Sequence, residues 1–162
     1  AVATVTDAAP AMRAEVLLAP MTGAAIRMTE VPDPVFASET MGTGAAVRPS
    51  EGKLYAPAAG TVTVLAETGH ALGMTTDAGA EVLMHIGIDT VTLEGRPFAA
   101  HVKVGDHVDA GQLLMDVDLD AIRAAGLSTE SAVIVTNADD LPKLHIIAGG
   151  IVSTGTPLFK FE

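Results

Sequence analysis

Two of the five histidines lie in sequence surroundings that could position an imidazole ring for chemistry. If the residues around His85 form a strand, its side chain shares one face with Leu83, because alternate side chains of a strand point to opposite faces. Gly87 then permits an unusual φ or a close approach of the backbone. Asp89 and Thr90 add an acceptor and a hydroxyl shortly afterwards. The segment therefore offers a ring on a defined face, with polar groups where its strand ends.

The second histidine, His70, follows Thr68 by two residues. The hydroxyl or carbonyl of that threonine could bond one ring nitrogen and so fix which nitrogen carries the proton. Such control of the tautomer is what phosphoryl or metal chemistry on an imidazole requires. The other histidines, His101, His107 and His145, are predicted to be structural or exposed, and His107 is predicted to bond to solvent.

Other motifs that carry chemistry are missing from the sequence. It contains no Gly-x-x-x-x-Gly-Lys-[Ser/Thr] loop, no complete dinucleotide fingerprint, no Gly-x-Ser-x-Gly elbow and no His-Glu-x-x-His helix. Two histidines without a third ligand would bind zinc only weakly, so His70 and His85 are at most partial zinc ligands. We therefore expect no cofactor and no required metal.

The composition indicates an acidic globular protein. Hydrophobic residues make up 49% of the 162 residues, which is enough for a sizeable core, while aromatic residues make up only 3%. The 20 acidic residues against 9 basic ones give a formal net charge of −11, which repels nucleic acid and anionic membranes. The absence of cysteine fits a reducing compartment. Nucleic acid is therefore not expected as a partner, and a cytoplasmic location is predicted.

The length fits one domain. Residues 1–12 are small and aperiodic and are predicted to be a flexible tail or linker remnant, with a single domain from 13 to 162. The start of the sequence shows no basic segment followed by an apolar one, and no apolar stretch approaches the length of a membrane span. These features predict a soluble protein.

Frequent glycine and proline leave only strand-length runs between breakers. Runs rich in β-branched and aliphatic residues predict strands at 61–65, 81–86, 112–118, 132–136 and 157–161. Only residues 120–125 and a turn around 34–38 are predicted to be helical. The predicted fold class is all-β, an antiparallel sandwich or flattened barrel with little helix.

An internal repeat indicates how the strands are organised. The segment Ala-Pro-Met-Thr-Gly at 19–23 recurs as Ala-Pro-Ala-Ala-Gly at 56–60. Each proline sets φ for a turn, and each glycine would supply a positive φ before the next strand. Two strand-turn-strand units are therefore expected. Residues 104–112 carry the paired glycine turns of biotinyl and lipoyl carriers, but the nearest lysines, Lys103 and Lys143, are predicted to be surface charges.

Three segments together resemble a known family. They are Leu-Tyr-Ala-Pro-Ala-Ala-Gly-Thr-Val at 54–62, Glu-Thr-Gly-His-Ala-Leu-Gly at 67–73, and residues 81–91, which contain the string His-Ile-Gly-Ile-Asp-Thr-Val. In this spacing they resemble the glucose-class enzyme IIA of the bacterial phosphoenolpyruvate:sugar phosphotransferase system. The similarity runs from about residue 16 to residue 161.

The resemblance implies a small antiparallel β-sandwich in which two histidines meet at a shallow depression. It implies that His85 accepts a phosphoryl group at Nε2, that His70 stabilises the phosphate, and that Thr68 hydrogen-bonds the His70 ring. The implied donor is the histidine phosphocarrier protein, and the implied acceptor is a sugar-specific enzyme IIB/IIC permease. Regulatory target proteins are a further class of partner in this family. The implied activity is that of a phosphotransferase with a phosphohistidine intermediate.

The resemblance also implies a docking surface. Two acidic residues, Asp33 and Asp89, match positions to which the phosphocarrier protein brings an arginine. The matching apolar rim consists of Val35, Phe36, Met41, Leu83 and Val91. Ala66 and Leu83 are smaller than the phenylalanines of some family members, so a flatter and more aliphatic rim is expected.

Three other interpretations remain open from the residues alone. A non-catalytic all-β regulatory or binding module would use these histidines only as core or surface residues. A zinc peptidase of related β architecture is compatible with the spacing of His85 and Asp89, but the His-x-His ligand pair is absent. A biotinyl-type carrier would need a lysine at a hairpin tip. A phosphorylated histidine, bound zinc or a lysine adduct would distinguish these functions.

Overall fold

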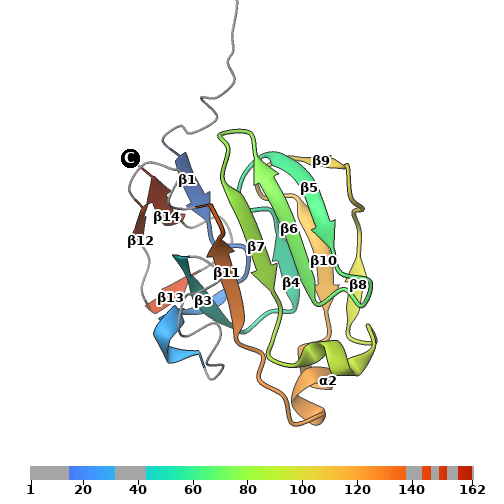
Figure 1. The fold of residues 1–162 in the computed structure, drawn as a ribbon. Coiled ribbons are helices and arrows are strands. Elements are labelled where there is room, and N and C mark those ends of the chain that lie inside the picture. Colours follow the sequence, from blue (N-terminus) through green and yellow to red (C-terminus); the bar gives the residue numbers. More distant parts are fainter. Residues whose placement is uncertain (1–14, 32–42, 138–143, 147–149, 153–156, 162) are drawn as a thin grey trace, which may run out of the picture.

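The computed structural model describes residues 15–31, 43–137, 144–146, 150–152 and 157–161. In these residues the strands form three sheets, and helix is confined to short segments (Figure 1). Every strand pair among them is antiparallel. The fold class predicted from the sequence, all-β with little helix, is confirmed.

The largest sheet of the described residues has eight strands. In spatial order they are β13 (Gly150–Val152), β2 (Gly23–Arg27), β3 (Thr43–Pro49), β11 (Ser131–Val135), β7 (Glu81–His85), β6 (Ala71–Thr76), β5 (Gly60–Leu65) and β9 (His107–Val108). Strands β11 and β7 therefore occupy its centre.

Two three-stranded sheets complete the structure of these residues. One has the order β1 (Glu15–Leu18), β14 (Pro157–Phe161) and β12 (Leu144–Ile146). The other has the order β4 (Lys53–Tyr55), β10 (Leu113–Val117) and β8 (Phe98–Ala100). In Figure 1, β4 and β10 lie behind β5, β6 and β7, so this half of the molecule has two layers.

An aliphatic core with several methionines fills the space between the layers. Leu54 and Leu114 of the small sheet and Met74 and Met84 of the large sheet are all 1% exposed or less. On β7 the side chains alternate as predicted, since Val82 and Met84 face this core while Leu83 and His85 are half-buried on the opposite face. The burial of one face fixes the register and therefore the side on which His85 lies.

The five predicted strands correspond to β5, β7, β10, β11 and β14. The predicted helix at 120–125 is α2 (Leu119–Ala124), whose first turn is capped by the Asp118 side chain accepting from Ala121 N–H at 3.0 Å. The predicted turn at 34–38 lies outside the described residues. Two 3-10 turns, η3 (Met28–Glu30) and η4 (Thr90–Leu93), were not predicted. No helix in the described ranges is both long and apolar enough to cross a membrane.

The sequence repeat at 19–23 and 56–60 is also a structural repeat. Tyr55 N–H donates to the Pro20 carbonyl at 2.8 Å, and Leu18 N–H donates to the Pro57 carbonyl at 2.9 Å. Each turn thus accepts a bond from the residue that precedes the other turn. The two strand-turn-strand units expected from the sequence hold each other in place by this exchange.

The glycine that ends each repeated segment is required by close backbone packing. A Cβ atom on Gly23 would lie 2.2 Å from the Arg48 carbonyl oxygen, and one on Gly60 would lie 2.3 Å from the Thr75 carbonyl oxygen. The expected positive φ is wrong for Gly60, which is not among the positive-φ glycines. Both glycines open a strand, β2 or β5, where the neighbouring strand passes too closely for a side chain.

The strand orders show that the repeat extends over the whole fold. The eight-stranded sheet reads β13, β2, β3, β11 from one edge and β9, β5, β6, β7 from the other. The small sheets match in the same way, β1-β14-β12 against β4-β10-β8. An approximate two-fold axis therefore passes between β11 and β7, where Val133 lies opposite Met84 and Ile134 opposite Leu83. The strands from β4 to β10 form one half, inserted between β3 and β11 of the other.

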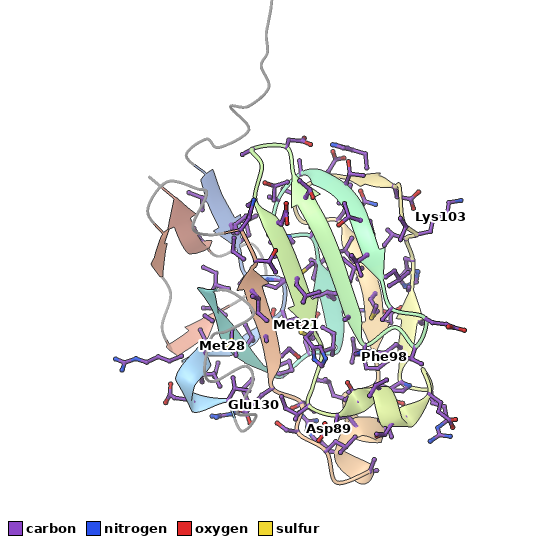
Figure 2. The ribbon with its side chains drawn as sticks, in the orientation of Figure 1. Met21, Met28, Asp89, Phe98, Lys103 and Glu130 are labelled. Carbon is purple, nitrogen blue, oxygen red and sulfur yellow. The ribbon has the colours of Figure 1, made fainter. Side chains whose placement is uncertain are left out.

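The outer face of the large sheet is covered differently in the two halves. On β3 and β11, the buried side chains of Ala46, Ala132 and Ile134 pack with Met28 and Val31 in a second, smaller hydrophobic cluster (Met28 is labelled in Figure 2). Met28 and Val31 belong to the long link between β2 and β3. In the other half, the equivalent link, between β5 and β6, consists only of residues 66–70. The outer face of β5, β6 and β7 is hollowed there, beside the strand that carries His85.

Candidate functional site

His70 and His85 lie side by side where two central strands meet. His85 is the last residue of β7 and lies opposite Ala71, the first residue of β6. His70 precedes Ala71, and its carbonyl accepts from Ile86 N–H at 2.7 Å. The two ring centroids are 5.2 Å apart, with an angle of 71° between the ring planes. Both side chains are half-buried. The structure therefore brings together the two histidines that the sequence analysis singled out.

The backbone fixes the tautomer of His85. Its Nδ1 atom lies 3.0 Å from the carbonyl oxygen of Gly87. A carbonyl oxygen only accepts hydrogen bonds, so Nδ1 carries the proton and donates it. In the neutral ring the lone pair then belongs to Nε2. In this tautomer Nε2 is the ring nitrogen of His85 whose lone pair can accept a proton or bond to an electrophile.

A left-handed backbone at Gly87 makes this contact possible. Gly87 has a φ of +71°, and a Cβ atom there would lie 2.5 Å from Thr90 Cγ2 and 2.9 Å from the Ser128 carbonyl oxygen. No other residue type fits this position without displacing its neighbours. The expectation that Gly87 serves a close approach or an unusual φ is confirmed, and here it serves both.

The ring of His70 is held by Thr68. The Thr68 hydroxyl lies 2.7 Å from Nδ1 of His70, so the expected hydrogen bond is present. Gly69 between them has a φ of +76°, and a Cβ atom there would lie 2.8 Å from Cβ of Phe98, which is labelled in Figure 2. Burial lowers the pKa of His70 below its ordinary value of 6.5. His70 is therefore neutral at pH 7, with one ring nitrogen bonded to Thr68.

Only part of the predicted docking surface lies within the described residues. Asp89 is exposed and opens η4 with a left-handed φ of 60°, at the lower end of the molecule in Figure 2. Leu83 is half-buried on the His85 face, and Val91 is 49% exposed. These three residues lie on the strand and turn that flank His85. Asp33, Val35, Phe36 and Met41 lie outside the described residues.

The remaining histidines lie away from this pair where they can be placed. His101 Nε2 lies 2.7 Å from Asp116, whose other carboxylate oxygen accepts from Lys53 at 2.8 Å. The hydrogen bonds from Lys53 and His101 hold the pKa of the Asp116 carboxyl below its ordinary value. His107 lies 3.2 Å from both carboxylate oxygens of Asp77, so the prediction that it bonds to solvent is wrong. Its partner, Asp77, lies in the turn between β6 and β7, and no sequence pattern near His107 predicts this contact. The side chain of His145 lies outside the described residues.

The described ranges contain no group of three or more histidine, cysteine, aspartate or glutamate side chains that could hold a metal ion. Within them, His70 and His85 offer two imidazole ligands and no more. A structural zinc site normally needs four ligands, and a catalytic one needs three from the protein.

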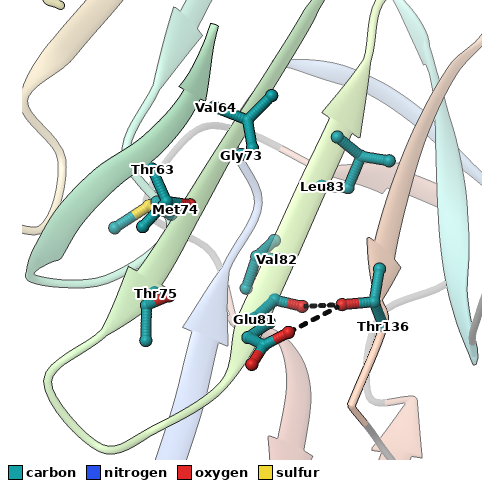
Figure 3. A pocket seen from close by; sticks show the side chains of 9 residues that line it. All are labelled: Thr63, Val64, Gly73, Met74, Thr75, Glu81, Val82, Leu83 and Thr136. Atoms are coloured by element: carbon teal, nitrogen blue, oxygen red, sulfur yellow. Dashed lines mark hydrogen bonds between the residues drawn. The ribbon is translucent and has the colours of Figure 1, made fainter. Parts of the chain in front are cut away.

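A shallow hollow of about 360 Å³ lies on the face of the sheet that carries His85. Its lining comes from β5, β6, β7 and the residue after β11, and it consists of Thr63, Val64, Gly73, Met74, Thr75, Glu81, Val82, Leu83 and Thr136 (Figure 3). At its far end the Thr136 hydroxyl bonds to the backbone and side chain of Glu81, both at 3.4 Å. Leu83 is the lining residue nearest to His85 along β7, and it lies on the same face of the strand.

Sequence reasoning missed the groups that hold the turn after His85. Ile88 N–H donates to the Ser128 carbonyl at 3.0 Å, and Gly87 N–H donates to the Ser131 hydroxyl at 3.3 Å. Both partners are distant along the chain and belong to a segment with no motif of its own. Thr90 was noted as a hydroxyl near His85, but its bond to the Ile86 carbonyl was not predicted.

Comparison with known proteins agrees with this arrangement. Residues 15–141 match the family described as the phosphoenolpyruvate-dependent sugar phosphotransferase system, EIIA 1. The glucose permease IIA from Mycoplasma capricolum superposes with a TM-score of 0.86 at 34% identity, covering 93% of this chain and 97% of that one. The fold is thus shared over nearly the whole of both chains.

Curated relatives include separate EIIA proteins and multidomain proteins. The glucose-specific EIIA component of Halalkalibacterium halodurans is 44% identical over 127 residues, 78% of this chain and 73% of that protein. The beta-glucoside-specific EIIBCA component of Dickeya chrysanthemi is 46% identical over 150 residues, 93% of this chain but only 24% of that protein. This chain thus spans about a quarter of the multidomain relative.

Proposed function

The chain belongs to the EIIA 1 family of the phosphoenolpyruvate-dependent sugar phosphotransferase system, and on this premise we propose that it relays a phosphoryl group through His85. The observation that carries the proposal is the hydrogen bond from His85 Nδ1 to the Gly87 carbonyl. This bond leaves the lone pair on Nε2, which is the state that a nitrogen nucleophile needs. His85 is thus the phosphoryl acceptor in this proposal.

The donor in this proposal is a phosphohistidine on the histidine phosphocarrier protein. The Nε2 lone pair of His85 attacks phosphorus, and the bond between phosphorus and the donor nitrogen breaks, with its electron pair returning to the donor ring. The Gly87 carbonyl stabilises the positive charge that His85 acquires, because Nδ1–H donates to it throughout. In the transfer to a sugar-specific EIIB partner, a nucleophile of that partner attacks phosphorus, and the bond between phosphorus and Nε2 of His85 breaks with its electron pair returning to the His85 ring. No metal or cofactor is needed for either step.

His70 stabilises the phosphoryl group in this proposal. If the Thr68 hydroxyl donates to Nδ1 of His70, the ring proton lies on Nε2 and is directed away from Thr68. The His85 ring lies beside it, with ring centroids 5.2 Å apart, so a phosphoryl group on His85 comes within reach of that N–H. A positioned N–H donor offsets the charge that develops on phosphoryl oxygens during transfer. Thr68 therefore acts by orienting His70.

The proposed partners dock on the surface around the pair. Asp89 supplies negative charge at its edge, and Leu83 and Val91 supply apolar contact. We retain Asp33, Val35, Phe36 and Met41 as predicted members of this surface. The names of the EIIBCA relatives join EIIA to EIIB and EIIC components in one chain, which supports an EIIB/EIIC partner here. A cytoplasmic location, a domain from 13 to 162 and a tail at 1–12 belong to the same proposal.

Phosphorylation in a purified system tests the function directly. The protein is incubated with phosphoenolpyruvate, the general phosphotransferase and the histidine phosphocarrier protein. We expect an adduct that is labile to acid and stable to base, located on His85 by mass spectrometry. His85→Ala should abolish it, while His107→Ala, which alters an exposed histidine paired with Asp77, should not. A folded wild-type protein that never becomes labelled would instead favour the regulatory or binding module.

A further inference from the structure

Two buried hydroxyl groups hold the peptide between Ile86 and Gly87 from opposite sides. The Thr90 hydroxyl donates to the Ile86 carbonyl, and the Ser131 hydroxyl accepts from Gly87 N–H at 3.3 Å. Thr90 is 0% exposed and Ser131 is 2% exposed. Water therefore does not compete for these bonds, and the plane of this peptide is fixed at both its carbonyl and its amide end.

The direction of each bond at Ser131 is defined. Its hydroxyl donates its own hydrogen to the Thr129 carbonyl at 2.9 Å. A lone pair is consequently directed toward Gly87 N–H, as an acceptor must be. Ser131 also lies on β11, the strand that pairs with β3 on one side and with β7 on the other. It therefore ties the turn after His85 to a central strand.

The next peptide along the chain makes the contact with the imidazole. Its N–H, from Ile88, donates to the Ser128 carbonyl at 3.0 Å, and its carbonyl, from Gly87, accepts from Nδ1 of His85 at 3.0 Å. The two peptides share the Cα atom of Gly87. Because the first peptide is held by Thr90 and Ser131 and the second is bonded to Ser128, the directions that the Gly87 carbonyl can take are limited.

We propose that Thr90 and Ser131 are positioning residues for His85, which keep the Gly87 carbonyl aligned with Nδ1 and thereby hold the ring in the tautomer with its lone pair on Nε2. Without that alignment the ring is free to carry its proton on Nε2. The attacking lone pair is then lost from Nε2, although His85 itself is unchanged. The catalytic consequence rests on the proposed phosphoryl transfer, whereas the effect on the tautomer does not.

The test measures the tautomer and the activity separately. In protein labelled with ¹⁵N at histidine, the chemical shifts of the two ring nitrogens report which one carries the proton at a pH where the ring is neutral. Thr90→Val keeps the shape of the side chain and removes the hydroxyl, and Ser131→Ala removes the other hydroxyl. Thr92→Val is the matched control, because its hydroxyl also bonds a backbone carbonyl of this turn, that of Asp89, but is exposed.

We expect His85 in the wild type and in Thr92→Val to carry its proton on Nδ1. Both Thr90→Val and Ser131→Ala should show a clear population with the proton on Nε2, and phosphoryl acceptance should fall roughly 10-fold, as for other groups that orient a functional histidine. Thr90→Ser and Ser131→Thr, which keep the hydroxyls, should restore the wild-type tautomer and rate.

Contrary results would overturn the inference. It fails if Thr90→Val is folded and His85 keeps its proton on Nδ1, or if Thr92→Val changes the tautomer equally. Thr90→Val conserves side-chain shape, so it serves this purpose even if Ser131→Ala proves unstable. A protein that shows the expected tautomer changes but is never phosphorylated would contradict the proposed function and leave the positioning role established.

Discussion

Ala132 on β11 lies directly opposite His85 on β7. On the other side of His85, Ala71 on β6 occupies the matching position. Side chains directly opposite each other in antiparallel strands have Cβ atoms about 5 Å apart, so larger residues at either position would cover the imidazole. Both sheet neighbours of His85 are thus alanines, whose side chains end at Cβ and do not extend over the imidazole ring.

Enlarging Ala71 should therefore reduce phosphoryl acceptance without unfolding the protein. Ala71 is 9% exposed, and Ala71→Val adds methyl groups that can extend toward the surface beside His85. Valine also suits a strand, so we expect the melting temperature to stay within a few degrees. The rate of labelling from the phosphocarrier protein should fall on the order of 10- to 100-fold.

The control for this substitution is Thr75→Val, on the same strand and face but opposite Glu81. It is expected to leave labelling unchanged. Equal rates for wild type and Ala71→Val would show that the space above the ring is not limiting.

His70 should make the stability of the protein depend on pH. Burial lowers its pKa in the folded state below 6.5, so as the pH falls through 6.5 the unfolded chain binds a proton before the folded one does. The stabilisation associated with neutral His70 is fully present above pH 6.5 and is lost on acidification toward the folded-state pKa. His70→Gln removes this contribution, so the wild type should lose more stability than the variant between pH 7.5 and 5.5.

Denaturant unfolding of both proteins at several pH values provides the measurement. Other titrating groups act alike in the two proteins and cancel in the difference between their free energies of unfolding. Parallel pH profiles would contradict the assigned burial of His70.

The strands of this fold could be predicted from the sequence, whereas the details of the site could not. Alternation around His85 correctly predicted that its side chain lies on the other face of the strand from Val82 and Met84. Every second residue of a strand points to the same face, so the buried face can be recognised from its apolar residues. The pairing of His85 with His70 came only from the family resemblance, since a contact between neighbouring strands leaves no periodic signal. The turn at Thr90–Leu93 was missed because its β-branched residues favour an extended strand.

The two-fold organisation was only partly visible in the sequence. The repeated segments at 19–23 and 56–60 revealed two similar turns, and a second pattern, Val-x-x-Gly-x-x-Leu, occurs at both 108–114 and 152–158. One half is inserted within the other, so equivalent strands such as β7 and β11 are not at a constant spacing from the repeat. The role of Ser131 was invisible for the same reason, because its link to Gly87 crosses from one half to the other.

Acidic residues at the rim should accelerate association with a basic partner. Asp89 is exposed beside the histidine pair, and Asp33 is predicted to join it on the same surface. The variant Asp33→Asn/Asp89→Asn removes two charges and keeps the side-chain shapes. We expect its association rate with the phosphocarrier protein to fall about 10-fold at low ionic strength, and much less at 0.5 M salt, where exposed charges are screened.

Stopped-flow measurements across a salt series would show this convergence. A matched control is Asp106→Asn/Asp109→Asn, which removes the same charge from the segments on either side of β9, at the far edge of the large sheet. If both double variants slow association equally, the association rate depends on the net charge of the chain. A specific effect of Asp33 and Asp89 would then be contradicted.

His70 should matter more for passing the phosphoryl group on than for receiving it. When the donor is a phosphohistidine, the docked partner supplies its own charge stabilisation, and Nε2 of His85 can still attack. On the forward step the departing phosphoryl group depends on donors of this chain, of which His70 is the one held beside His85 by Thr68. His70→Gln keeps an N–H donor but loses the rigid ring and its bond geometry. An interaction that is made only in the transition state costs rate without costing occupancy.

We therefore expect His70→Gln to be labelled nearly fully by the phosphocarrier protein and to transfer to the sugar-specific partner on the order of 100-fold more slowly. Quench-flow measurement of each half-reaction separates the two steps. Thr68→Val, which frees Nδ1 of His70 without removing the ring, should give an intermediate loss in the second step only. If His70→Gln is folded and cannot be labelled at all, His70 belongs to the acceptor machinery or is itself the acceptor. The roles of the two histidines would then have to be exchanged, because the bond from His85 to Gly87 would orient a supporting ring and not the nucleophile.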